Sequence, residues 1–303
     1  MSTQSEHVIA FGVDARFAPH LAVVLTSVVK NAPGGNFRFL VLHDGLPQEH
    51  KDHLISCAPN QTFEWHEITE AGYLALEGKR HISRASYYRI AIPDFAPSTA
   101  EKVVYLDADI VVTGDIRELW DVDLKGKMVG GVFDPGVDPV EFAKQYDLSP
   151  RYLGYLNSGI LLLDLKQIRE KKAFDTVFEI VRDKAGKLEY NDQDAINIAF
   201  WNEWTSIDPV WNVQRRMVVR NENKPCFAKD EDMPTHRRPK IIHYTEHNKP
   251  WSQDAYHPYT WKYYTYLKQT PYWKEVAKSA NATLLRNLRR RLRTFLSWLP
   301  LKA

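Results

Sequence analysis

The sequence predicts an α/β fold with a mostly parallel sheet and helices on both of its faces. Three observations lead to this prediction. Short apolar runs typical of strands alternate with stretches of helical spacing, beginning with residues 8–13, 21–29 and 37–42. Residues 102–112 form a nearly continuous apolar and β-branched run, as expected of a strand that is buried on both faces. Polar side chains follow several of these runs, and such sheets bind ligands at the carboxyl ends of their strands.

The other elements follow from the same periodicities. Helices are expected at residues 48–57, 83–92, 115–120 and 166–184, with Pro93 stopping the second. Further strands are expected at residues 62–68, 128–133, 160–165 and 241–244, the third of them after Asn157-Ser158-Gly159. Residues 134–154 contain three prolines and are expected to form an irregular loop that is long enough to act as a lid.

Composition divides the chain into two parts. Its 303 residues are 44% hydrophobic and 26% charged, as in a soluble globular protein. Residues 256–303 carry ten Lys/Arg and one acid, which leaves 30 bases and 37 acids, a net charge of −7, on residues 1–255. An acidic body argues against a nucleic-acid-binding protein, whose basic patch should lie on the folded domain. A basic tail favours an anionic surface as its partner.

The tail itself has a pattern typical of an interfacial helix. Residues 256–273 are rich in aromatic side chains, and leucines at helical spacing follow between residues 284 and 299. Five arginines between residues 286 and 293 surround this stripe, and Trp298 lies near its end. A cationic amphipathic helix of this kind lies in a membrane interface. The alternative is a terminal helix docked on the body with its arginines solvated.

Several classes of protein and site lack support. There is no G-x-G-x-x-G and no G-x-x-x-x-G-K-[ST] motif, so a Rossmann dinucleotide site and a P-loop are not indicated. Two cysteines suggest neither a zinc cluster nor a disulfide framework. Residues 1–7 are polar and lack the pattern of a signal peptide. No run approaches the roughly 18 apolar residues of a membrane span. We therefore expect a cytoplasmic protein that lies peripherally on the inner face of the cytoplasmic membrane.

Two aspartates, Asp107 and Asp109, lie inside the run 102–112. If the strand continues through them, both side chains point to the same face. Two unpaired carboxylates in apolar surroundings are costly, and a bound cation relieves that cost. Oxygen ligands suit Mg²⁺ or Mn²⁺, whose coordination shell substrate phosphates usually complete. We therefore predict a metal–diphosphate site here; the alternative is a pair of strand-end aspartates that begin a turn.

Two other candidate site residues have simpler structural explanations. Asp192 could be the N-cap of a helix over residues 195–200, although capping explains neither Gln193 nor Asp194. His243 ends a short strand, and a lone histidine is more often structural than a ligand.

Six segments between residues 8 and 251 have a joint order and spacing that are highly specific, although each is weak alone. They are Phe11–Asp14, His81–Arg89, Val104–Asp109, Leu156–Leu161, Asn191–Asp194 and His243–Trp251. Together they resemble glycosyltransferase family 8, and most closely its bacterial galactosyl- and glucosyltransferases of the lipopolysaccharide core.

The resemblance implies a GT-A fold for residues 1–255, with residues 256–303 as an extension. It implies retaining transfer of galactose or glucose from a UDP-sugar to a hydroxyl of a glycan or lipid-linked saccharide, with Mn²⁺, or alternatively Mg²⁺, as cofactor. By analogy, the metal ligands are Asp107, Asp109 and His243, and the catalytic residues are Arg89, Asp192 and Gln193. The implied substrate-binding residues are Asp14 and Phe17 at the uracil, Lys249 at the diphosphate, and Arg89, Ala108, Asn157, Ser158, Asp192 and Gln193 around the donor sugar.

The sequence departs from the family pattern at three positions. Arg16 stands where relatives often have Asn, Phe17 lacks a tyrosine hydroxyl, and Glu246 replaces a glycine expected in the loop before Lys249. Two other functions remain as alternatives. The segment 106–111 also resembles the first motif of haloacid-dehalogenase-type phosphatases, although that motif normally lies near the N-terminus. A non-catalytic sugar-nucleotide-binding protein is the second alternative.

Overall fold

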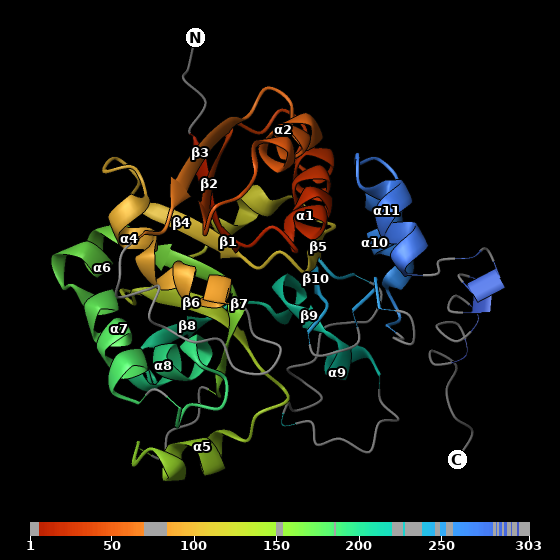
Figure 1. The fold of residues 1–303 in the computed structure, drawn as a ribbon. Coiled ribbons are helices and arrows are strands. Elements are labelled where there is room, and N and C mark those ends of the chain that lie inside the picture. The colour runs from red at the N-terminus through yellow and green to blue at the C-terminus, as the bar shows by residue number, and fades with distance from the viewer. Residues whose placement is uncertain are drawn as a thin grey trace.

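The structure, a computed structural model, describes residues 6–69, 84–149, 154–184, 186–219, 227, 238–245, 249–252, 257–280, 283, 285–286, 288–289, 292 and 296. Its centre is a seven-stranded sheet (Figure 1). In spatial order the strands are β3 (Thr62–Glu67), β2 (Phe37–His43), β1 (His7–Val13), β4 (Lys102–Leu106), β7 (Leu156–Asp164), β6 (Val129–Phe133) and β8 (Trp204–Ser206). The first four strands are parallel, β7 runs antiparallel to β4 and β6, and β8 is parallel to β6. The predicted mostly parallel α/β sheet is confirmed.

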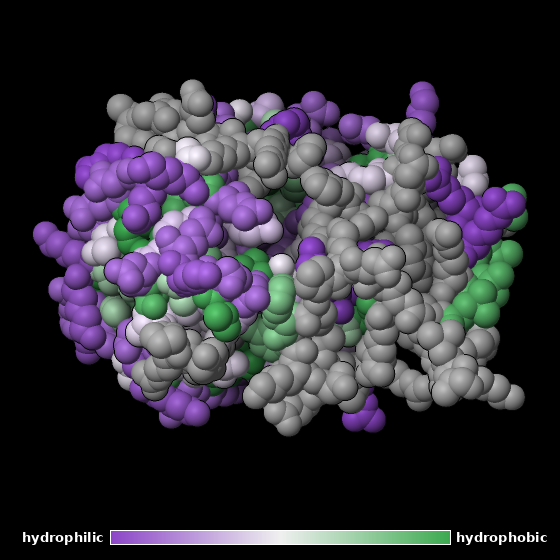
Figure 2. All heavy atoms as spheres, turned by 90° about the horizontal axis from the view of Figure 1, so that it is seen from below, coloured by the Kyte–Doolittle hydropathy of each residue, from purple (hydrophilic) through white to green (hydrophobic). Residues whose placement is uncertain are grey.

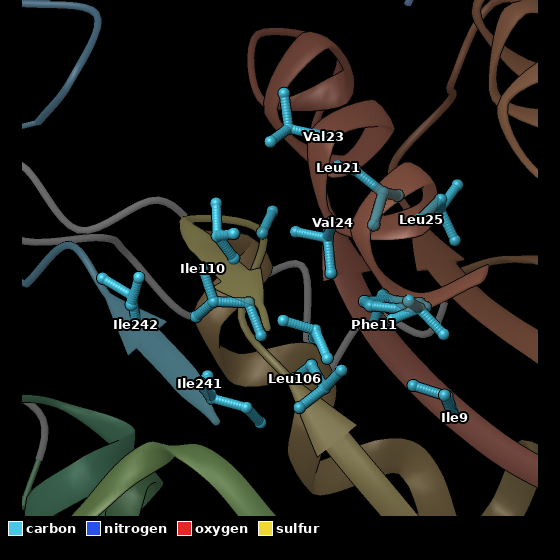
Figure 3. Close-up of a cluster of buried hydrophobic side chains, with 14 of the residues drawn as sticks. Ile9, Phe11, Leu21, Val23, Val24, Leu25, Leu106, Ile110, Ile241 and Ile242 are labelled. Atoms are coloured by element: carbon cyan, nitrogen blue, oxygen red, sulfur yellow. The ribbon is translucent and has the colours of Figure 1, made fainter. Parts of the chain in front are cut away.

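Helices cover both faces of this sheet because its strands alternate between two apolar sides. In β1, Ile9, Phe11 and Val13 belong to one core, whereas Val8 and Ala10 belong to the other. The first core packs under α1 (Ala18–Asn31) and α2 (Gln48–Cys57), and Figure 3 shows its centre. The second packs under η1 (Arg84–Ala91), α4 (Ile92–Phe95), α6 (Leu165–Glu170), α7 (Ala173–Asp183) and α8 (Asp192–Ala199).

The central apolar run is two strands rather than one, so the expected continuous strand over residues 102–112 is wrong. After β4 the chain turns at residues 107–109, and β5 (Ile110–Val112) joins a second sheet with β10 (Ile241–His243) and β9 (Val213–Gln214). The turn is held on both sides, because the Asp107 amide donates to the Gly159 carbonyl at 2.8 Å and the Tyr244 amide to the Asp109 carbonyl at 3.0 Å. β4 and β5 are equally apolar because both strands are buried, so the pattern of apolar residues did not indicate the turn between them.

Four smaller expectations are also corrected. Pro93 does not stop a helix, because it lies in the first turn of α4, where its missing N–H costs nothing. Residues 139–145 of the expected loop form α5, which is capped by the Asp138 side chain. The helix over 166–184 breaks between α6 and α7, where Lys172 has a φ of 50°. The segment 157–159 lies inside β7 rather than before it.

Short helices complete the description: η2 (Ile116–Leu119), η3 (Pro209–Trp211), α9 (Arg215–Val218), α10 (Thr260–Leu267) and α11 (Trp273–Ser279). The aromatic residues of α10 and α11 are part of the first core. The Tyr263 hydroxyl oxygen lies 2.7 Å from His20 Nδ1, and the Tyr266 hydroxyl accepts a hydrogen bond from Asn31 Nδ2 at 2.7 Å. α10 therefore packs on α1 (Figure 1), and Tyr272, at the start of α11, contacts His50 and His53 of α2. Among the described residues, no helix combines the length and apolarity needed to cross a membrane.

Candidate active site

A cavity of about 710 Å³ lies where β1, β4 and β6 end and the antiparallel β7 begins. Its wall includes every residue that the sequence analysis named for the site. These residues are Asp14, Phe17, Arg89, Asp107, Ala108, Asp109, Asn157, Ser158, Asp192, Gln193, His243 and Lys249. They come from the ends of strands, from η1, from the N-termini of α1 and α8, and from the loop that carries Lys249, and they meet at one edge of the sheet.

Three of these side chains converge at the turn between β4 and β5. Asp107 and Asp109 each offer a carboxylate oxygen and His243 offers a ring nitrogen. These three possible ligand atoms lie within 4.8 Å of one another. His243 Nε2 lies 3.2 Å from Asp109 Oδ1 and 3.8 Å from Asp107 Oδ2. Asp109 Oδ1 is buried and has no hydrogen-bond partner among the described residues. A buried carboxylate oxygen of this kind is costly unless a cation binds it, so these atoms fit a divalent ion.

Lys249 neutralises the other oxygen of Asp109. Its ammonium group is ion-paired with Asp109 Oδ2, so that Oδ1 alone remains for another ligand. Burial by itself raises the pKa of Asp109, but Lys249 and His243 outweigh this effect and hold the pKa below its ordinary value.

Nearby, Trp251 stacks on His20 with ring centroids 3.5 Å apart. Burial lowers the pKa of His20 to about 3, so this ring is neutral.

Arg89 joins the aspartate turn to the start of α8. Only 4% of Arg89 is exposed, and its guanidinium contacts Asp107 Oδ1 at 2.9 Å and Asp192 Oδ2 at 3.0 Å. It also donates to Ser158 Oγ at 2.8 Å and lies over the Tyr105 ring at 4.5 Å. Burial raises the pKa of Asp192 to about 6 in spite of the opposing charge of Arg89.

The capping explanation for Asp192 is wrong. The N-cap of α8 is Asn191, and its side chain makes no capping hydrogen bond. Asp194 instead fixes the preceding loop, because it accepts the backbone N–H groups of Glu189 and Tyr190 at 2.7 and 3.0 Å.

Two amide side chains line the wall beside the aspartate turn. Gln193 Oε1 accepts the Ser158 N–H at 3.0 Å, and its Nε2 donates to Asp134 Oδ2 at 3.3 Å. Asn157 Nδ2 donates to the same Asp134 oxygen at 2.9 Å, and its Oδ1 accepts the Gly159 N–H at 3.1 Å. Both amides are therefore fixed in orientation by backbone groups that can only donate.

The opposite end of the cavity is built by the segment that follows β1. Asp14 Oδ1 accepts the Phe17 N–H at 3.1 Å, and Asp14 Oδ2 accepts from Arg16 at 2.8 Å. Arg16, one of the departures from the family pattern, therefore already contacts the carboxylate expected at the uracil. Glu246, another departure, lies outside the described residues, as do residues 81–83.

Three residues at or behind the cavity wall, Asp134, Asn212 and Tyr105, were not predicted from the sequence. Asp134 could have been found, because it follows the strand β6 directly, as Asp107 follows β4. Tyr105 is buried in β4 and donates to Asp107 Oδ1 at 2.7 Å. Asn212 is fully buried and contacts His243 Nδ1 at 3.0 Å. Nothing in the local sequence around Asn212 indicates this contact.

Comparison with known proteins agrees with this geometry. The family model "Glycosyl transferase family 8" matches residues 8–255. Among curated proteins, the chain is 27% identical over 274 residues to general stress protein A of Bacillus subtilis, covering 88% of this chain and 94% of that protein. It is 28% identical over 271 residues to the lipopolysaccharide 1,2-glucosyltransferase of Escherichia coli, covering 88% and 79%.

Solved structures show the same fold. The galactosyltransferase LgtC, in complex with donor and acceptor sugar analogues, superposes with a TM-score of 0.75 at 22% identity, over 88% of this chain and 96% of LgtC. The bifunctional glycosyltransferase WbbM superposes with a TM-score of 0.74 at 24% identity, over 92% of this chain and 52% of WbbM. The expected GT-A fold is confirmed, and the phosphatase alternative finds no support in these matches. The chain belongs to glycosyltransferase family 8.

Proposed function

We propose that this glycosyltransferase moves a hexose, galactose or glucose, from a UDP-sugar to a hydroxyl of a lipopolysaccharide-core or related glycan, with retention at the anomeric carbon. The observation that carries the proposal is the convergence of Asp107, Asp109 and His243 around one unpartnered, buried carboxylate oxygen. Two oxygens and an imidazole suit Mn²⁺ somewhat better than Mg²⁺. The acceptor class follows the names of the relatives, which include a lipopolysaccharide 1,2-glucosyltransferase and, from Salmonella typhimurium, a lipopolysaccharide 1,3-galactosyltransferase.

The residues around the cavity have separate tasks in this proposal. Asp14 accepts from the uracil, and Phe17 stacks beside it. Asp107, Asp109 and His243 would hold the divalent ion, and the ion would supply positive charge to stabilise the departing diphosphate. Lys249 adds a second positive charge at the same phosphates. Arg89, Ala108, Asn157, Ser158, Asp192 and Gln193 orient the donor sugar.

Retention without a covalent intermediate agrees with the chemistry of the wall. The family resemblance places Gln193 where such a nucleophile would lie, and an amide is a poor nucleophile; the Asp192 carboxylate beside it is engaged as well. The Gln193 carbonyl oxygen accepts the Ser158 amide, and the Asp192 carboxylate is paired with Arg89. We therefore infer attack by the acceptor hydroxyl on the face from which UDP leaves. In that step the bond from the anomeric carbon to the UDP oxygen breaks, the bond to the acceptor oxygen forms, and the acceptor proton passes to the leaving phosphate.

The test is a screen of UDP-sugars with Mn²⁺, with and without extracted lipopolysaccharide core, in which release of UDP is measured. Asp107→Asn and Asp109→Asn should each abolish transfer and metal-dependent UDP binding, because a neutral amide removes one of the two negative charges that balance the divalent ion. Asp183→Asn, at the exposed end of α7, is the control for loss of one carboxylate. Normal turnover in either site variant would refute the metal site, and tight UDP binding without turnover would favour a non-catalytic binding protein.

We further propose that the end of the chain attaches the enzyme to an anionic membrane surface, where a lipid-borne acceptor lies. Leu285, Leu288, Leu292 and Leu296 follow helical spacing, and 54–62% of each is exposed. Figure 2 shows hydrophobic surface at the right edge, on the side where Figure 1 places the end of the chain. The arginines among these leucines would add about 1 kcal/mol each at an anionic leaflet.

A further inference from the structure

A row of side chains leads from the cavity wall to the back of the proposed metal ligand His243. Asp134 follows β6, Asn157 lies in β7, and Asn212 follows η3. Asn157 Nδ2 donates to Asp134 at 2.9 Å, Asn212 Nδ2 donates to Asn157 Oδ1 at 2.8 Å, and His243 Nδ1 lies 3.0 Å from Asn212 Oδ1. Asn212 is fully buried and Asn157 is 4% exposed, so water does not compete for the contacts of Asn212 with Asn157 and His243, whereas Asp134 is half-buried at the cavity wall.

The direction of every hydrogen bond in this row is fixed by one backbone group. The Gly159 N–H, which can only donate, lies 3.1 Å from Asn157 Oδ1 and therefore identifies that atom as the oxygen. The Asn212 group that faces the same oxygen must then be its NH₂, which turns its carbonyl oxygen towards His243. An amide oxygen only accepts, so the proton of the imidazole must be on Nδ1.

We propose that Asn212, oriented by Asn157 and Asp134, is a positioning residue that keeps the proton of His243 on Nδ1. The lone pair of Nε2 then faces Asp109 Oδ1 at 3.2 Å and Asp107 Oδ2 at 3.8 Å. Three electron-pair donors meet there, and the ring cannot turn without losing its partner. The partner of a ligating imidazole generally sets its tautomer and orientation, and its removal costs about 10–100-fold in metal affinity.

The same row also reaches Gln193, which donates to the Asp134 oxygen that accepts from Asn157. Asp134 therefore holds two amides at once, one behind the proposed metal ligand and one at the proposed donor sugar. The inference rests on the proposed function, because it assigns His243 to the metal, but the tautomer of the ring can be measured without any metal.

The test combines two measurements on Asn212→Leu, a variant with the same number and branching of side-chain heavy atoms. The first is ¹⁵N NMR of the histidine rings in metal-free protein, at a pH about two units above the ordinary histidine pKa. We expect the Nδ1–H form of His243 in the wild type and a shift towards the Nε2–H form in the variant. The second is calorimetry with Mn²⁺ alone, in which we expect the affinity of the variant to fall about 10–100-fold.

Two further variants separate positioning from general destabilisation. Thr205→Val removes one buried hydrogen bond, to the Leu124 carbonyl, outside the cavity wall and should leave Mn²⁺ affinity unchanged. Asn212→Asp keeps an acceptor for Nδ1–H and should bind Mn²⁺ more tightly than Asn212→Leu. Wild-type Mn²⁺ affinity in Asn212→Leu, or an Nε2–H ring in the wild type, would overturn the inference. If the wild type has the Nδ1–H ring but binds no Mn²⁺, the proposed metal site fails instead.

Discussion

Replacing Gly159 by alanine adds one methyl group, which should weaken metal binding strongly while the protein still folds. Gly159 lies in β7, and a Cβ built there would be 2.7 Å from Asp107 Oδ2 and closer still to the His243 ring. Ordinary contacts begin at 3.4 Å, so the carboxylate would have to move by about 0.7 Å and the ring by more. Metal–ligand distances tolerate only about 0.2 Å.

The backbone at Gly159 is held against the aspartate turn itself. Its carbonyl accepts the Asp107 amide at 2.8 Å, and the next residue, Ile160, is paired with Leu106 of β4. We therefore expect Gly159→Ala to reduce Mn²⁺ affinity by about 100-fold or more, the upper end of the range for a disturbed ligand. The free energy of unfolding should fall by only about 1–3 kcal/mol, as in other overpacked sites.

The matched control is Gly130→Ala in the neighbouring strand β6. A Cβ there would meet Leu124 Cδ2 at 2.6 Å, which is the end of a flexible side chain away from the proposed ligands. Calorimetry with Mn²⁺ and denaturant unfolding of both variants make the comparison. We expect similar losses of stability but loss of Mn²⁺ binding in Gly159→Ala alone. Wild-type Mn²⁺ affinity and transfer rate in Gly159→Ala would refute the geometry of the site.

Three other predictions concern Arg89, Asp192 and the end of the chain. Arg89→Met leaves Asp107 and Asp192 without their common buried cation, so urea unfolding should show a loss of about 3–5 kcal/mol; a loss below 1 kcal/mol would contradict this. The pKa of Asp192 rises from 3.8 in the unfolded chain to about 6 in the folded protein, so the folded state binds the proton more tightly. The free energy of unfolding should therefore fall as the pH rises from about 4 to 6. Asp192→Asn should flatten the plot of that free energy against pH in this range, and an unchanged slope would count against the shift. Deleting residues 281–303 should release the protein from anionic vesicles in a sedimentation assay and leave UDP-sugar hydrolysis intact, because α11 and its core contacts remain; unchanged sedimentation would rule out the proposed attachment.

The candidate site was largely predictable because its first half is local in sequence. Asp107 and Asp109 are two residues apart, and the sequence around them shows both the buried strand and the acids at its end. The acid after the first apolar run likewise identified Asp14, whereas Asn157, at the start of the antiparallel β7, was expected only from the family resemblance. The acids were predictable because the carboxyl ends of parallel strands share one edge, whatever the details of packing.

The sequence by itself determined the fold class, the elements with regular periodicity and the residue types of the site. The tertiary structure alone decided that residues 102–112 divide between two sheets, because an apolar run reports burial and not the partner that covers it. It alone brought Lys249 to Asp109, 140 residues away, and Asn212 to His243. Those contacts depend on how distant strands pair, and no local preference of the chain encodes such pairing.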